Sequence, residues 1–343
     1  MLPFFVILLL IGSLIANCVS VTDPFNLPRE NRTLIVLAAP SVWDVNYLDD
    51  FGEIAGFQVE LARILHEHEN VIIIADRHTI PYLSGSVELL KYHLPLDAIV
   101  EGNIYDINLH DFAPLGVKKF VKFIYRNNDW ADIASKQVID NGINKAIISN
   151  RIFEQNANRM PEWATMIKLY NVFKKIMIVP PFNQTDLRLD DLIAFIDEEI
   201  VVVSSLDYMV YDRLAAELQK KYRRDIMLLD LPVTRSKDEE GNCGIYSALL
   251  ATDKYVYVPV YGKYYYLYYF CKRNSPSHWD RGYSSMMDKM VLQMIETNTH
   301  KKVVPVSVPR KICRRGLSLR SMAWTVSGHA ADVIIELARR RFS

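Results

Sequence analysis

Apolar residues recur along the chain in two patterns, short runs and helical faces. Short apolar runs bounded by turn residues predict buried strands. They occupy residues 33–39, 71–75, 98–100, 120–124, 146–149, 176–179, 200–204, 227–231, 246–251, 255–260 and 303–308. Apolar positions spaced three and four residues apart predict amphipathic helices. These occupy residues 56–67, 87–92, 161–173, 208–222, 285–296 and 330–341, whereas 187–195 fits either kind of element.

The order of these elements indicates one continuous α/β domain, because strands and single helices alternate without a linker or a low-complexity segment. Half of the 343 residues are hydrophobic and 23% are charged, which excludes a disordered chain. Lys+Arg and Asp+Glu number 40 each, so the formal net charge is zero. No nucleic-acid partner is expected, because the chain lacks the bulk positive charge that attracts one.

The first 20 residues are predicted to be a secretory signal peptide. Residues 3–16 form an unbroken apolar run that is short for a membrane span, and small residues follow it. A retained membrane anchor is the alternative. Residues 21–32 would form an N-terminal extension of a secreted protein. Asn31 and Asn183 each begin an Asn-x-Thr sequence, so both are candidate glycosylation sites.

Several segments in succession resemble the agmatine deiminases and the bacterial-type peptidylarginine deiminases. The resemblance runs over roughly residues 34–335. Its segments are LPLDAIVEGNIYDINLHDFAPL (94–115), FVKFIYR (120–126), DNGINKAIISN (140–150), RLDDLIAFID (188–197), YSALL (246–250), VYVPVYG (256–262) and GLSLRSMAWTV (316–326). The resemblance implies a pentein-type α/β propeller, a single domain over residues 33–343 built from five ββαβ-like modules around a narrow central site. It implies neither a cofactor nor a metal.

The resemblance also implies which residues meet a substrate. Family members grip a guanidinium with two aspartates, and these fall on Asp111 and Asp190, which are kept. The general-base His falls on Arg188, which stays protonated and cannot take up a proton. The nucleophilic Cys falls on Ala323, which has no nucleophile. The resemblance therefore implies a deiminase-like protein that is catalytically inactive and binds agmatine, arginine or an arginyl peptide, or acts as a scaffold.

Two departures from the family pattern raise further hypotheses. The Arg188 guanidinium could pair with Asp111 or Asp190 and fill the site from within; alternatively it points to solvent. Cys313 is the thiol nearest in sequence to the lost nucleophile, and its basic neighbours would lower its pKa. An active agmatine or peptidyl-arginine deiminase that uses Cys313 as a relocated nucleophile is therefore the alternative function. A disulfide from Cys313 to Cys243 or Cys271 would exclude that role.

Three remaining features are weaker candidates. His66 and His68 point to different faces of a helix end, so they form a poor metal pair. The Tyr-rich segment 264–269 fits either strand packing or a contact surface. The basic segment 301–343 could hold the protein on an anionic surface, although a solvated helix face is the usual explanation of such a pattern. A third hypothesis is thus an interaction protein whose pocket is vestigial.

Overall fold

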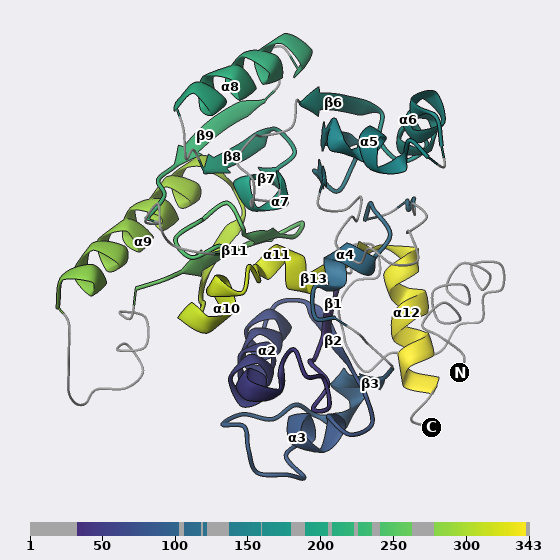
Figure 1. The fold of residues 1–343 in the computed structure, drawn as a ribbon, viewed down its shortest axis with the longest axis vertical. Helices are drawn as coiled ribbons and strands as arrows, with labels where there is room; N and C mark the ends of the chain where they lie inside the picture. The colour runs from purple at the N-terminus through teal and green to yellow at the C-terminus, as the bar shows by residue number, and fades with distance from the viewer. Residues whose placement is uncertain are drawn as a thin grey trace. The chain divides into compact units, whose positions relative to one another are not determined.

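The structure is a computed structural model, shown as a ribbon in Figure 1. It describes residues 33–102, 106–117, 119–121, 137–158, 160–179, 189–204, 208–222, 226–234, 241–262 and 278–340. The chain divides into two compact units. Unit 1 contains residues 1–109 and 322–343, and unit 2 contains residues 110–321. No helix within the described ranges is long and apolar enough to span a membrane.

Unit 1 is built on a four-stranded sheet in the order β13-β1-β2-β3. Its strands are β1 (Thr33–Ala38), β2 (Asn70–Ala75), β3 (Ile99–Glu101) and β13 (Ala323–Ser327). Its helices are η3 (Leu48–Asp50), α2 (Phe51–His66), α3 (Ile80–Ser84), η4 (Leu96–Ala98) and α12 (His329–Arg340). Strand β13 is antiparallel to β1, and β1, β2 and β3 are parallel to one another. Every residue of β1 is buried, as expected for a central strand covered on both faces.

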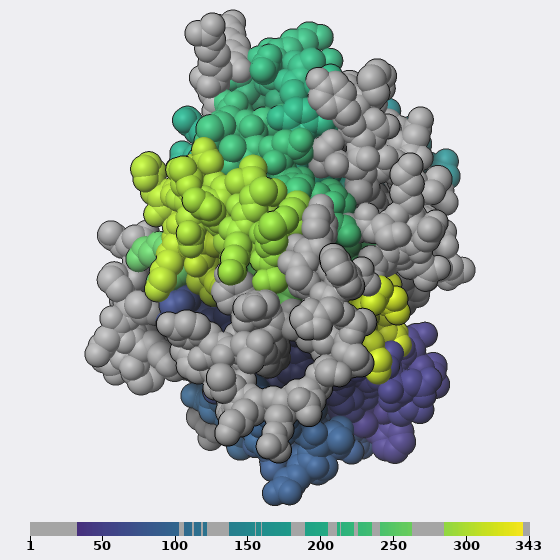
Figure 2. Space-filling model, turned by 90° about the vertical axis from the view of Figure 1, so that its left-hand side faces the viewer, coloured from purple at the N-terminus to yellow at the C-terminus, as the bar shows by residue number. Residues whose placement is uncertain are grey.

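Unit 2 contains three sheets of three strands each. Their strands are β4 (Val138–Asp140), β5 (Lys145–Ser149), β6 (Lys175–Val179), β7 (Ile193–Asp197), β8 (Ile200–Ser204), β9 (Met227–Leu231), β10 (Leu250–Ala251), β11 (Tyr255–Val260) and β12 (Lys302–Ser307). The helices are α4 (Leu109–Phe112), α5 (Arg151–Asn156), α6 (Glu162–Tyr170), α7 (Leu189–Leu192), α8 (Tyr208–Tyr222), α9 (His278–Asn298), α10 (Arg310–Arg314) and α11 (Leu319–Met322). Both α8 (green) and α9 (yellow-green) reach the surface on the face drawn in Figure 2.

The four sheets share one connection pattern. In each sheet, one strand pairs antiparallel with a neighbour on one side and parallel with a neighbour on the other. A helical segment connects the two parallel strands. In unit 1 the chain's last strand, β13, provides the antiparallel partner of β1. The alternation of strands and helices predicted an α/β fold, and that is confirmed. The expected strand at 120–124 falls almost entirely outside the described residues; Val121 alone forms an antiparallel bridge to Leu115.

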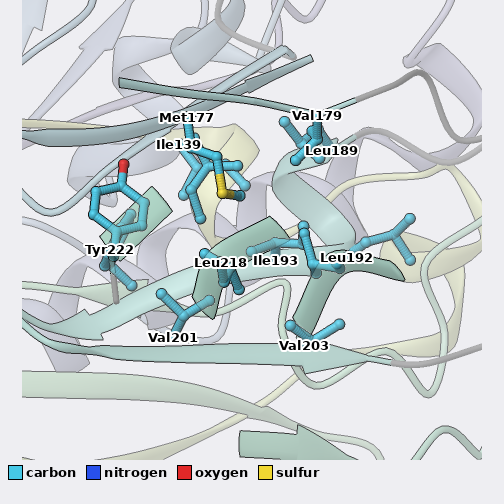
Figure 3. Close-up of a cluster of buried hydrophobic side chains, with 13 residues drawn as sticks. Ile139, Met177, Val179, Leu189, Leu192, Ile193, Val201, Val203, Leu218 and Tyr222 are labelled. Carbon is cyan, nitrogen blue, oxygen red and sulfur yellow. The ribbon is translucent and has the colours of Figure 1, made fainter. Parts of the chain in front are cut away.

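The core of unit 2 connects neighbouring sheets. Figure 3 shows buried side chains from β4, β6, α7, β7, β8 and α8 in one cluster. Tyr222, at the end of α8, adds a polar anchor, since its hydroxyl donates a hydrogen bond of 2.8 Å to the carbonyl of Ala146 in β5. Burial raises the pKa of this phenol, so it stays a hydrogen-bond donor. The cluster thereby fixes the position of α7.

One predicted helix and one predicted strand are wrong. Residues 87–92 are not helical; instead α3 lies earlier, and it ends at Gly85, whose φ of 86° lies in the left-handed region. Asp76 accepts hydrogen bonds from the backbone N–H groups of His78 and Thr79, and this turn starts the chain into α3. The expected strand over 246–251 is reduced to Leu250–Ala251. Its earlier residues form a buried turn, in which the N–H of Ser247 bonds to a side chain, Ser204 Oγ, instead of to a strand.

Candidate functional site

Helix α4 carries the first retained aspartate. Leu109 is 3% exposed and anchors this single turn in the core, while Pro114 lies just past its end. Asp111 is buried as well, with 3% of its surface exposed. A buried carboxylate needs a cation or hydrogen-bond donors to offset its desolvation. The burial of Asp111 is unusual for a turn residue.

Helix α7 carries the second retained aspartate, between two leucines of the core. Leu189 and Leu192 belong to the cluster in Figure 3, and each fully buried leucine contributes about 1.5 to 3 kcal/mol. Asp190 and Asp191, between them, are 0% and 1% exposed. Strand β7 begins at the next residue, Ile193, so the sheet and the core together hold both carboxylates in place.

His110 connects the two helices. Its Nδ1 atom lies 3.6 Å from Oδ2 of Asp190, which is beyond hydrogen-bond distance but within range of an ion pair when the imidazole is protonated. Only 15% of the His110 side chain is exposed. Sequence patterns assigned His110 no role. The His110–Asp190 contact places α4 beside α7.

A buried turn over residues 241–249 also contacts α7. Ser247 Oγ donates a hydrogen bond to the backbone carbonyl of Asp191. In the same turn, the carbonyls of Asn242 and Ile245 accept hydrogen bonds of 3.1 and 2.9 Å from the Tyr261 hydroxyl. Burial and then the negative charges of Asp191 and Asp288 raise the pKa of Tyr261, which keeps it a donor. The sequence predicted a strand here, and the contacts that hold the turn in place join residues far apart in the chain.

Cys313 is not available as a nucleophile. It forms a disulfide with Cys243, with the two Cα atoms 4.8 Å apart. The hypothesis of a relocated Cys313 nucleophile is therefore wrong, because a disulfide sulfur has no thiolate to attack a guanidinium. Of the pairings left open, the structure selects Cys243 over Cys271. A hydrogen bond accompanies this disulfide, because the backbone N–H of Asn242 donates to the carbonyl of Cys313 at 2.7 Å.

Ala323 begins β13 and pairs with Leu37 of β1. It is 2% exposed, and its methyl group offers no nucleophile. The other predicted site residues are Arg188, Asn31 and Asn183, and they lie outside the described residues, as do Cys271 and the Tyr-rich segment 264–269. Among the residues that are described, no group of three or more His, Cys, Asp or Glu side chains is placed to hold a metal ion.

A further buried carboxylate, Asp288 in α9, has a structural role. It is 0% exposed and accepts hydrogen bonds from Tyr246 Oη (2.7 Å), Tyr261 N (3.1 Å) and Gly262 N (2.7 Å). Gly262 allows this close approach, because a Cβ there would lie 2.7 Å from the Cα of Ser285. The network joins α9 to the end of β11. Its three donors give the buried Asp288 carboxylate the hydrogen bonds that it would otherwise make with water.

The pH dependence of stability is expected to report on Asp288. Burial raises its pKa, and this effect outweighs the three hydrogen bonds, which lower it. The folded protein therefore binds this proton more tightly than the unfolded chain. Its stabilising contribution is present below the unfolded carboxyl pKa and is lost as the pH rises through the raised folded pKa. In urea unfolding, wild type should lose stability relative to Asp288→Asn as the pH rises above about 4, the ordinary carboxyl pKa. A difference that is constant with pH would contradict this assignment.

Comparisons with solved structures place the fold. No protein-family model matches the sequence, and no curated protein matches it. Solved structures do match, and those described next are named agmatine deiminases or a peptidyl-arginine deiminase, so the chain shares their mixed α/β fold. Agmatine deiminase of C. jejuni is 15% identical, with a TM-score of 0.62 over 88% of this chain and 95% of that one.

Two further structures agree. Agmatine deiminase of Enterococcus faecalis is 13% identical, with a TM-score of 0.60 over 88% of this chain and 94% of that one. A candidate peptidyl-arginine deiminase is also 13% identical, with a TM-score of 0.64 over 87% of this chain and 97% of that one. The C. jejuni enzyme has also been solved with its substrate bound. The mixed α/β deiminase fold implied by the sequence motifs is thus confirmed. Sequence identities this low establish the fold and not the activity.

Proposed function

We propose that this chain is a non-catalytic, deiminase-like protein that binds a guanidinium group through Asp111 and Asp190. The observation that carries the proposal is the pair of buried carboxylates on α4 and α7, two helices that approach each other where His110 lies 3.6 Å from Asp190. A guanidinium offers planar, charge-assisted donors that match carboxylates, and burial strengthens such bonds. The matching solved structures include enzymes named for agmatine, a guanidinium compound.

The loss of catalysis is supported by the missing nucleophile. Deiminase chemistry needs a thiolate to attack the guanidinium carbon and a base to move protons. Ala323 stands where the family resemblance puts the thiol, and Cys313 is tied to Cys243. Arg188 stands where the resemblance puts the base. A site that keeps both aspartates and lacks the thiol and the base is expected to bind a guanidinium without converting it.

The proposal extends to the architecture and the compartment. The shared strand–strand–helix–strand order of the four sheets supports five such modules arranged as a propeller in one domain over residues 33–343. The Cys243–Cys313 disulfide supports passage through an oxidising compartment, which agrees with the expected signal peptide and with glycosylation at Asn31 and Asn183.

The test measures thermal stability and ammonia release in parallel. Purified protein with agmatine, arginine or an arginyl peptide is expected to melt at a higher temperature and to release no ammonia. Asp111→Asn and Asp190→Asn should each weaken binding about 10- to 100-fold, because each removes a charge-assisted pair. Asp253→Asn, in the exposed turn between β10 and β11, is the matched control and should bind as wild type does.

The other outcomes are equally informative. Ammonia release by wild type would show an active hydrolase whose nucleophile is not Cys313. The absence of any thermal shift with all three compounds would leave the carboxylates without a guanidinium ligand and favour the interaction protein. Circular dichroism of each variant separates lost binding from lost folding.

A further inference from the structure

Unit 1 exposes four large hydrophobic side chains on two neighbouring segments. They are Trp43, Val45, Leu48 and Leu89, with exposures of 73%, 82%, 56% and 54%. We name these four residues the Trp43 surface. Leu48 lies one turn before Gly52 in the continuous run of η3 and α2, and the side chain of Leu89 lies 3.8 Å from the point where a Cβ on Gly52 would be. Groups of exposed large apolar side chains on neighbouring segments are typical of interaction sites.

The loop that carries Trp43 and Val45 is tied to its neighbours. The backbone N–H of Val42 donates to Thr79 Oγ1 at 3.0 Å, and Thr79 is fully buried. The Tyr47 hydroxyl donates to Asp106 Oδ1 at 2.9 Å. The Trp43 ring lies edge-on to the His78 ring, with centroids 6.0 Å apart. The apolar side chains are thus held in place before any partner arrives, which lowers the entropy lost on binding.

The surface lies where ligands commonly meet α/β sheets. The loop follows the carboxyl end of β1, and Thr79 lies just past the carboxyl end of the parallel strand β2. Ligands bind outside this edge in open α/β sheets. The segments from residue 40 to 66 (purple) and from 80 to 101 (blue) both reach the surface in Figure 2.

The charge around the surface selects the partner. Residues 43–62 contain no Lys, Arg or His, and they contain five acidic residues. These are Asp44, Asp49, Asp50, Glu53 and Glu60. Two basic residues, Arg77 and His78, lie beside Trp43, but the five acidic residues outnumber them. A net acidic surface disfavours an anionic membrane, a nucleic acid and the same surface of a second copy. It attracts a partner that is both apolar and cationic.

We propose that the Trp43 surface binds a cationic amphipathic peptide segment, in which large apolar residues alternate with Lys or Arg. Trp43 is its central anchor, because exposed tryptophan gains the most from burial at an interface. The acidic side chains around it steer the cationic residues of the partner. This site lies in unit 1 and is independent of the guanidinium site, whose aspartates belong to unit 2.

The test uses a fluorescent synthetic peptide of about twelve residues with alternating Leu and Lys, titrated with the full chain and read by anisotropy. Lys in place of Arg keeps the probe from mimicking a guanidinium ligand. The expected Kd is about 10 to 100 µM, because four side chains make a small interface, and it should weaken as salt is added. Trp43→Ser and Asp49→Lys should each weaken binding about tenfold.

Three controls keep the proposal falsifiable. Trp163 in α6 is 67% exposed, similar to Trp43, so Trp163→Ser should leave the Kd unchanged. Asp190→Asn should also leave it unchanged, and a Leu-Glu version of the peptide should not bind. The proposal is overturned if the Leu-Lys peptide does not bind at millimolar concentration, if the Leu-Glu peptide binds equally well, or if Trp163→Ser weakens binding as much as Trp43→Ser. Thermal melts confirm that each variant is folded.

Discussion

Replacing Cys243 and Cys313 together by serine is expected to lower the free energy of unfolding by about 2 to 4 kcal/mol. The two cysteines are 70 residues apart, and a closed loop of that length removes much conformational entropy from the unfolded chain. Both cysteines are buried, with Cys243 6% and Cys313 2% exposed, so the serines would place two hydroxyls in the interior. Urea unfolding under oxidising conditions measures the loss.

Reduction provides the control for this prediction. Wild-type protein in a strong thiol reductant should approach the stability of the double variant, whereas the double variant should not respond to the reductant. Wild type that is equally stable with and without reductant would show that the cross-link does not contribute. Because the disulfide joins the turn that supports Asp191 to helix α10, loss of guanidinium binding should accompany loss of stability.

Replacing Asp288 by alanine is expected to destabilise the protein by about 3 to 5 kcal/mol, the largest effect of a single substitution considered. The change removes the acceptor of three hydrogen bonds, from Tyr246, Tyr261 and Gly262, at a position with no exposed surface. Buried donors left without acceptors lose their hydration and gain nothing in return. The measurement is the midpoint and slope of urea unfolding.

Tyr246→Phe is the matched variant for Asp288. It removes one of the three donors and keeps the carboxylate, so it should cost only about 1 kcal/mol. The rings of Tyr246 and Tyr261 pack edge to face, with centroids 5.4 Å apart, and phenylalanine preserves that contact. Equal losses for Tyr246→Phe and Asp288→Ala would mean that the phenol alone carries the network.

A deiminase site has two parts, the acids that bind the guanidinium and the groups that react with it. Gripping a cation requires buried acids in a fixed position, and this chain has them in Asp111 and Asp190. Transforming the cation requires a thiolate and a base, and the positions that the resemblance assigns to them hold Ala323 and Arg188. A protein with only the first part can bind or sense a guanidinium compound without consuming it.

The amino-acid sequence by itself determined the fold class and the approximate place of most elements. Apolar runs and helical faces are local signals, so β11 and α8 were predicted with the observed bounds, Tyr255–Val260 and Tyr208–Tyr222. The order of motifs also indicated a deiminase-like fold, which the solved structures confirm. Local signals failed at α3 and at residues 246–249, where side chains of Asp76 and Ser204 take up backbone hydrogen bonds.

Tertiary structure alone decided which distant residues meet. The spacing of cysteines left two partners open for Cys313, and the packing of α10 against the turn at 241–249 selected Cys243. His110 and Asp190 are 80 positions apart, and the cores beneath α4 and α7 bring them within 3.6 Å. The exposure of the Trp43 surface was likewise decided by tertiary packing. Periodicity describes a single element, whereas contacts between elements depend on how all of them pack around shared cores.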